Sequence, residues 1–141
     1  MGGCASARRG AALGVNRVVG IGRVLPPVGP RRGDVHFVAF PDLDGRVIRG
    51  PHPAVVVQSD RLARSATVIV APLTSAPRSA PERPPYLVPL AAREADLPRD
   101  GFIKCDQLTT LPVSLLGPRV GRLNPEAMGR LDAALRFVLA L

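Results

Sequence analysis

The chain of 141 residues is long enough for one domain, and its 46% apolar content allows a real core, which must be aliphatic because aromatic residues make up only 4%. The net charge is +8, but residues 1–32 hold six arginines and no acidic residue, so the remainder is only mildly basic. A polyanionic partner is therefore compatible with the charge without being required by it, and no apolar run is long enough to span a bilayer.

The two cysteines give no sign of a metal site. A structural zinc site is built from closely spaced cysteines or from cysteines clustered with histidines. Cys4 and Cys105 form no Cys-x-x-Cys pair and no such cluster. Cys105 lies in an apolar strand pattern and is expected to be a small core residue. The sequence thus predicts a reduced, cytoplasmic protein without a structural zinc site, and no cofactor is expected.

Residues 1–30 carry Gly, Arg, Pro and Ala without a stable period. We expect either a disordered basic leader or a translation start that truly lies later, near Val24 or Val28. Residues 1–6 also match the short N-myristoylation pattern. The folded domain is expected to span residues 31–141.

The first strand and the loop after it follow a turn at residues 32–34. Residues 35–40 are apolar enough for a strand. Residues 41–51 contain turn-forming residues together with Arg46 and Arg49, and so predict an exposed loop.

The central elements are two β-branched apolar runs at residues 53–60 and 67–75. Val, Ile and Thr are stiff at χ1 and fit a pleated surface, so each run predicts a buried strand. The six residues between the runs are too few for a crossover helix, which makes the strands antiparallel neighbours. Polar side chains at the strand ends are expected to gather where a ligand can reach them: Gln58, Ser59, Thr74 and Ser75.

The following segment predicts short strands separated by turns. Residues 76–85 form a loop, and residues 86–90 an edge strand because of Pro89. Alternation over residues 102–108 indicates a half-buried strand. The remaining short elements are a helical turn within 91–99, a turn at 97–101, a turn or short helix at 112–117 and a last strand at 119–123.

The C-terminal segment carries the clearest helix signal. Asn124 is a good N-cap, Pro125 suits the first helical position and Glu126 favours the positive helix terminus. One apolar face is predicted from spacings of three and four residues: Met128, Leu131, Leu135 and Val138, broadened by Leu139 and Leu141. Several short strands with one helix predict a small, strongly bent sheet or barrel.

Taken in order, these segments resemble the MazF/PemK family of type II toxins. The matching pieces are residues 32–35, 53–60, 67–75, 97–100, 105–107, 116–123 and the helix through Leu141. The resemblance runs from Arg31 to Leu141 and leaves out residues 1–30.

The resemblance implies a mainly β fold with some α, an SH3-like β-barrel of the CcdB/PemK type with a C-terminal helix. It implies a homodimer that cuts single-stranded RNA at short sequences, without a metal and without the ribosome. It also implies a cognate antitoxin whose disordered tail covers the RNA groove.

The implied catalytic pair is an arginine just before the Pro-Ala-Val strand and a threonine at the end of the next strand. The threonine is Thr74, but the arginine position holds His52. A histidine can act as base or acid in RNA cleavage, and Arg46 or Arg49 is expected to supply the missing positive charge. Base edges are expected to be read by Gln58, Ser59, Ser75 and Gln107.

Two other interpretations remain open from the sequence. A catalytically degenerate member would act by binding an antitoxin or a protein target such as DNA gyrase, which a related toxin fold targets. A purely structural SH3-like module would have no toxin role. Both share the fold with the ribonuclease interpretation, and an RNA cleavage assay separates the ribonuclease from them.

Overall fold

The computed structural model describes residues 29–42, 44–45, 48–75 and 83–141. Seven strands and one α-helix are present: β1 Asp34–Phe40, β2 Gly50–Val56, β3 Thr67–Thr74, β4 Leu87–Leu90, β5 Gly101–Lys104, β6 Thr109–Pro112, β7 Leu116–Arg122 and α1 Pro125–Leu139. Short 3₁₀ helices cover Asp60–Leu62, Ala92–Glu94, Cys105–Gln107 and Val113–Leu115. The predictions made for residues 1–28 lie outside the described residues.

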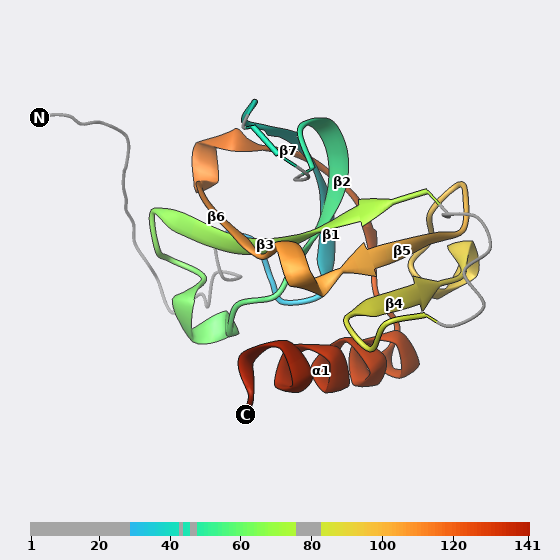
Figure 1. Cartoon of the computed structure of the whole chain (residues 1–141). Coiled ribbons are helices and arrows are strands. Elements are labelled where there is room, and N and C mark those ends of the chain that lie inside the picture. Colours follow the sequence, from blue (N-terminus) through green and yellow to red (C-terminus); the bar gives the residue numbers. More distant parts are fainter. Residues whose placement is uncertain (1–28, 43, 46–47, 76–82) are drawn as a thin grey trace, which may run out of the picture.

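The strands form one antiparallel sheet in the order β4-β5-β3-β2-β1-β7, with β6 paired to the first half of β3 (Figure 1). β3 is the common strand, because its first half pairs with β6 and its last two residues pair with β5. β2 runs along its other edge in the register Ala54↔Pro72. The predicted antiparallel pair is therefore confirmed.

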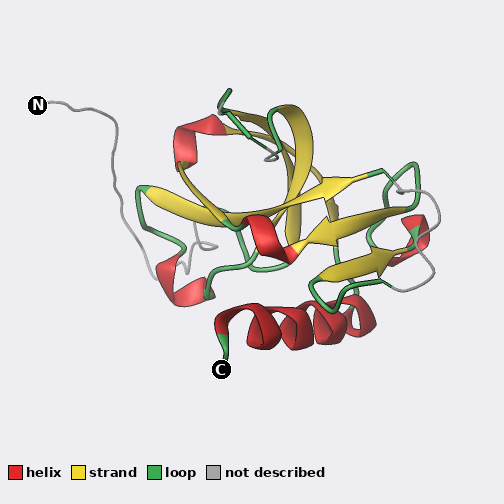
Figure 2. Cartoon of the chain, viewed as in Figure 1, coloured by secondary structure: helices red, strands yellow, loops and turns green. Residues whose placement is uncertain are grey.

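The sheet curls into a barrel that stays open on one side. β6, β3, β2, β1 and β7 follow one another around a ring, and in the described residues no pairing joins β6 to β7 (Figure 1). Helix α1 lies outside this ring, against the β4–β5 end of the sheet (Figure 2). None of the described helices is long and apolar enough to cross a membrane.

The apolar run of β2 is continuous because both of its faces are buried. Val55 and Ala71 pack in the core between the sheet and α1, together with the fully buried Leu131. Ala54 and Val70 point the other way, into the interior of the ring. A strand that is covered on both faces has no polar alternation, which is the pattern that the sequence shows.

The N-terminus of α1 follows the prediction. Asn124 accepts a hydrogen bond from the Ala127 amide through its side-chain oxygen, at 2.9 Å, and Pro125 occupies the first turn. The expectation that Leu139 and Leu141 broaden the buried face is wrong, since they are 51% and 84% exposed. The helix ends at Leu139 and is followed by Ala140 in the left-handed conformation, so Leu141 does not continue the helical face.

The strand assignment in the second half of the chain differs from the prediction in several places. The expected strand at residues 102–108 ends at Lys104. Cys105–Gln107 form a 3₁₀ turn, in which Cys105 stays buried and its amide still donates to the Tyr86 carbonyl at 3.0 Å. The last strand begins three residues earlier than expected, at Leu116. β6 was not predicted, because Thr109–Pro112 is a short, proline-ended strand that pairs only with β3.

Candidate functional site

A groove of about 280 Å³ opens at the end of the sheet where β2 begins and β3 ends. His52 from β2 and Thr74 from β3 both line it. The rest of its lining comes from β1, from the residues next to these two, and from the connection before β5: Phe37, Pro53, Leu73, Ser75, Leu97, Pro98, Arg99, Asp100 and Gly101. The structure thus brings the two predicted catalytic residues into one site.

The strand β2 fixes the position of His52. β2 begins at Gly50, three residues before the predicted start, so His52 is a strand residue that lies opposite Val38 of β1. Its side chain is half-buried, and within the described residues neither ring nitrogen makes a hydrogen bond. The imidazole is therefore available to a ligand in the groove.

Thr74 is the last residue of β3, where it lies opposite Phe102 of β5. Its hydroxyl donates one long hydrogen bond, 3.3 Å, to the carbonyl oxygen of the adjacent Ser75. Such a weak local bond leaves the hydroxyl able to turn toward a ligand. The exposed Ser75 follows directly on the groove wall.

A fixed connection, residues 97–101, forms the opposite wall of the groove. A carboxylate oxygen of Asp100 accepts a hydrogen bond from the Ala92 amide at 2.8 Å, and the Leu97 amide donates to the Ala92 carbonyl at 3.0 Å. Gly101 lies so close to β3 that a Cβ added to it would sit 2.8 Å from the Thr74 carbonyl oxygen. The absence of a side chain at Gly101 lets this wall approach the end of β3.

An ion pair joins the helix to the segment just before that wall. Glu94 accepts hydrogen bonds from the Ala91 amide at 2.9 Å and from the Arg130 guanidinium at 2.7 Å. The backbone bond and the Arg130 bond both hold the pKa of Glu94 below its usual value. The Glu94 carbonyl also accepts from the Asn124 amide, at 2.7 Å. The groove wall is thereby tied to α1.

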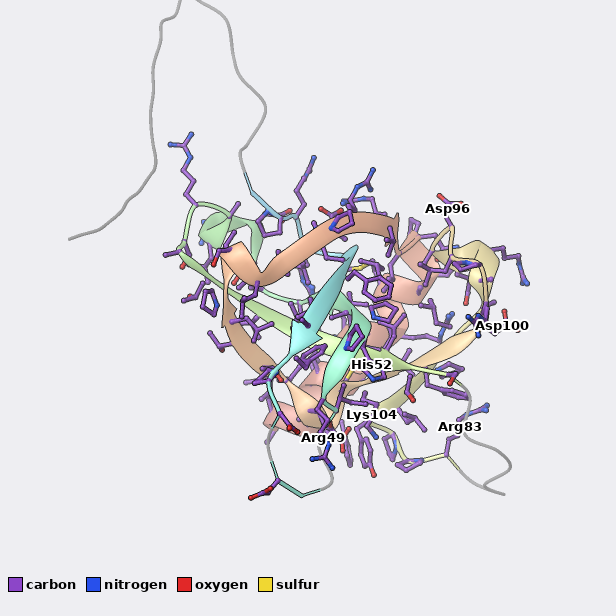
Figure 3. All side chains as sticks on the ribbon, turned by 90° about the horizontal axis from the view of Figure 1, so that it is seen from above. Arg49, His52, Arg83, Asp96, Asp100 and Lys104 are labelled. Atoms are coloured by element: carbon purple, nitrogen blue, oxygen red, sulfur yellow. The ribbon has the colours of Figure 1, made fainter. Side chains whose placement is uncertain are left out.

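A basic and aromatic surface continues beside Thr74. The Arg83 guanidinium lies over the Phe102 ring, 5.4 Å from its centroid. Lys104 follows two residues later on β5 and is 4.0 Å from Asp106. Figure 3 labels Arg49, His52, Arg83 and Lys104 in the same view from above, together with Asp100 of the groove wall.

Gln58 and Ser59 do not join the groove, so the expected cluster of four polar strand-end residues is wrong. In an antiparallel pair the end of β2 lies beside the start of β3, at the opposite end from Thr74. Gln58 is buried: its side-chain oxygen accepts from the Ile69 amide at 3.2 Å, and its side-chain nitrogen donates to the Leu62 carbonyl at 3.3 Å. Ser59 accepts from the Arg61 amide and caps the 3₁₀ turn.

The other predicted RNA contacts lie outside the groove lining or outside the described residues. Gln107 accepts a hydrogen bond from the Ile48 amide at 2.7 Å and so links the 3₁₀ turn to the β1–β2 connection. Arg49 is exposed and pairs with Asp42 at 3.3 Å. Arg46 lies outside the described residues.

The predictions left out the residues of the groove wall. Arg99 and Asp100 were assigned to a turn and to the family resemblance but to no site, because nothing in their local pattern shows that they lie beside β3. A long-range contact between Gly101 and Thr74 places them there. With a titratable imidazole, a hydroxyl and a guanidinium around one cavity, the site can transfer a proton and bind an anion.

Comparison with known protein families identifies the family of this chain. Residues 31–139 match the family described as PemK-like, MazF-like toxin of type II toxin-antitoxin system. The chain belongs to this family. The resemblance inferred from the sequence is confirmed, and the chain is thus a toxin of the PemK/MazF type.

Two relatives of this toxin are similar along almost their whole length. The probable endoribonuclease MazF of Mycolicibacterium smegmatis is 34% identical over 111 residues, covering 79% of this chain and 97% of the relative. Endoribonuclease EndoA of Bacillus subtilis is 33% identical over 112 residues, covering 79% and 95%. A mycobacterial endoribonuclease, solved in complex with its cognate antitoxin, superposes with a TM-score of 0.63 at 28% identity, covering 80% of this chain and 97% of that one.

Proposed function

We propose that this toxin is an endoribonuclease that cuts single-stranded RNA at short sequences, without a metal ion and without the ribosome. The observation that carries the proposal is that His52 and Thr74 line one groove, open to solvent, at one end of the sheet. The relatives named as endoribonucleases support the same activity.

His52 and Thr74 divide the chemistry between them. The His52 imidazole takes the proton from the ribose 2′-OH, and the 2′ oxygen attacks the adjacent phosphorus. The bond from phosphorus to the 5′ oxygen of the next nucleotide breaks, and that oxygen takes up a proton from water. The protonated His52 then returns its own proton to solvent. The products are a 2′,3′-cyclic phosphate and a 5′-OH end. The Thr74 hydroxyl donates to a phosphoryl oxygen as negative charge develops on it.

The RNA extends from the groove along the neighbouring surface. Ser75 contacts the nucleotide beside the scissile phosphate, because it follows Thr74 on the same wall. Arg46, Arg49 and Gln107 contact the strand beyond the groove, as arginine and amide side chains do with phosphates and base edges. Gln58 and Ser59 are not assigned to RNA binding, because they lie at the other end of the β2–β3 pair.

Three further properties belong to the same proposal. The toxin is a homodimer whose protomer is residues 31–141, it acts in the cytoplasm, and a cognate antitoxin holds it inactive. The family assignment and the relative that was solved with its antitoxin support the last point. Sedimentation of the purified toxin, alone and with the product of the neighbouring reading frame, tests both assemblies.

The decisive test incubates purified toxin with a mixed-sequence RNA in EDTA and maps the new ends by sequencing. We expect cuts at a short recurring sequence, with 2′,3′-cyclic phosphate on one side. His52→Ala and Thr74→Ala should remove the cuts, whereas Thr67→Ala, at the opposite end of β3, should not. Intact RNA at every pH between about 5 and 9 would discard the proposal and favour a toxin that acts by binding alone.

A further inference from the structure

The groove requires a permanent positive charge that His52 and Thr74 do not supply. A phosphate that is attacked by a 2′ oxygen gains negative charge in the transition state, and fixed cations stabilise it there. An imidazole that acts as base is neutral when the reaction begins, and a hydroxyl has no charge. Neither proposed catalytic side chain can therefore neutralise the phosphate before proton transfer.

Arg99 is the one arginine or lysine among the described residues that line the groove. Its side chain is exposed, and within the described residues it makes no hydrogen bond, ion pair or ring contact. Its neighbour Asp100 is the one carboxylate in the same lining, and that carboxylate is held by the Ala92 amide at 2.8 Å. The Arg99 guanidinium is therefore left available for an anion.

The backbone of Arg99 is held in place from both sides. Asp100 anchors the connection to Ala92, and Gly101 brings it against the Thr74 carbonyl, where a Cβ would be 2.8 Å from the oxygen. On the other side the Arg122 amide of β7 donates to the Ala95 carbonyl at 3.1 Å. This bond holds the segment just before the connection against β7. A charge presented from a fixed backbone is already positioned before the substrate arrives.

We propose that Arg99 is a further catalytic residue, whose guanidinium binds the non-bridging oxygens of the scissile phosphate and stabilises the charge that builds on them. The inference rests on the proposed ribonuclease activity. A guanidinium suits this task because it stays protonated and offers two parallel donors to a phosphate. The groove then holds three complementary groups: His52 for the proton, Thr74 for one oxygen and Arg99 for the charge.

The experiment compares the kinetics of Arg99→Ala, Arg99→Gln and Arg99→Lys with those of the wild type, on one RNA that contains the mapped cut site. Arg93→Ala is the matched control, because Arg93 is an exposed arginine in the segment just before this connection and does not line the groove. We expect Arg99→Ala and Arg99→Gln to lower kcat about 10²–10³-fold with a much smaller change in KM, since the contact forms mainly in the transition state. Arg99→Lys should recover part of the loss, and Arg93→Ala should behave as wild type.

The outcomes separate this inference from the function on which it rests. If the wild type cuts RNA and the kcat of Arg99→Ala stays within about twofold of the wild-type value, the role of Arg99 is overturned and the ribonuclease proposal stands. A higher KM with an unchanged kcat also overturns the role of Arg99, because it would indicate that Arg99 only attracts RNA to the surface. A wild type that cuts no RNA overturns the ribonuclease proposal and the inference together. Circular dichroism confirms that each variant is folded, which we expect because the exposed Arg99 makes no hydrogen bond, ion pair or ring contact within the described residues.

Discussion

His52 on β2 and Thr74 on β3 line one groove because the two strands run antiparallel and bring the start of β2 beside the end of β3. The register Ala54↔Pro72 puts each of them two residues beyond the last paired position. The pairing between β2 and β3 thus ends where the groove opens. Strand pairing, rather than a flexible loop, fixes the spacing of the two side chains.

The pH dependence of cleavage should reveal the role of His52. Only the neutral form of an imidazole accepts a proton, so a rate that depends on His52 as base should rise with pH. His52→Arg should lack this rise, because arginine keeps its charge as pH rises. Single-turnover rates of both proteins, measured on the same RNA from pH 5 to 9, test the assignment. A wild-type rate that falls as pH rises would show that the imidazole acts as the acid instead.

Thr74 should act through its hydroxyl and not through its shape. Thr74→Val keeps the shape and removes the donor, so kcat should fall by about 10²-fold or more. Thr74→Ser keeps the hydroxyl and should stay much closer to wild type. The comparison is made from kcat and KM on the mapped RNA. Equal losses in the two variants would mean that packing of the methyl group matters and that the hydroxyl does not.

Gly101→Ala should damage both the fold and the groove. The added methyl group would sit 2.8 Å from the Thr74 carbonyl oxygen, so β5 or β3 must shift. Overpacking of this kind costs about 1–3 kcal/mol of unfolding free energy. Chemical denaturation and the cleavage rate are measured together, with Gly129→Ala as control because a Cβ there meets nothing within 4 Å. Wild-type stability for Gly101→Ala would contradict the close packing.

The buried thiol of Cys105 predicts a loss of stability in alkali. Burial, helped by the nearby Asp106 charge, raises the pKa of this thiol from 9.0 to about 12. Above pH 9 the unfolded state releases a proton that the folded state keeps. The contribution of the thiol to the free energy of unfolding is therefore complete below pH 9 and is lost as pH rises toward 12. Denaturation of wild type and Cys105→Ala between pH 7 and 11 measures the difference. A wild-type protein that gains stability relative to the variant above pH 9 would contradict this prediction.

The elements that depend on local chemistry could be predicted from the sequence. The β-branched runs of β2 and β3 and the Asn124 cap specify their own conformation, and the structure has them as strands and a helix start. The core position of Cys105 followed from its apolar neighbours. In each case the neighbouring residues suffice, since propensity and periodicity act over a few positions.

The errors arose where a distant contact decides the outcome. Polar residues at the carboxyl ends of two antiparallel strands belong to opposite ends of the sheet, so Gln58 could not meet Thr74. The buried Cys105 fits a strand period, yet β5 ends at Lys104 and a 3₁₀ turn begins at Cys105, where nothing in the local pattern marks the change. Arg99 enters the site only through the contact between its connection and β3.

The most direct test of the central claim, that His52 and Thr74 act on one phosphodiester, is a double-mutant cycle on kcat with His52→Ala, Thr74→Val and the double variant. Groups that act on the same transition state are strongly non-additive, so the double variant should lose little more than the worse single variant. Losses that multiply, each variant contributing its full factor, would place the two side chains in separate roles and contradict the shared site.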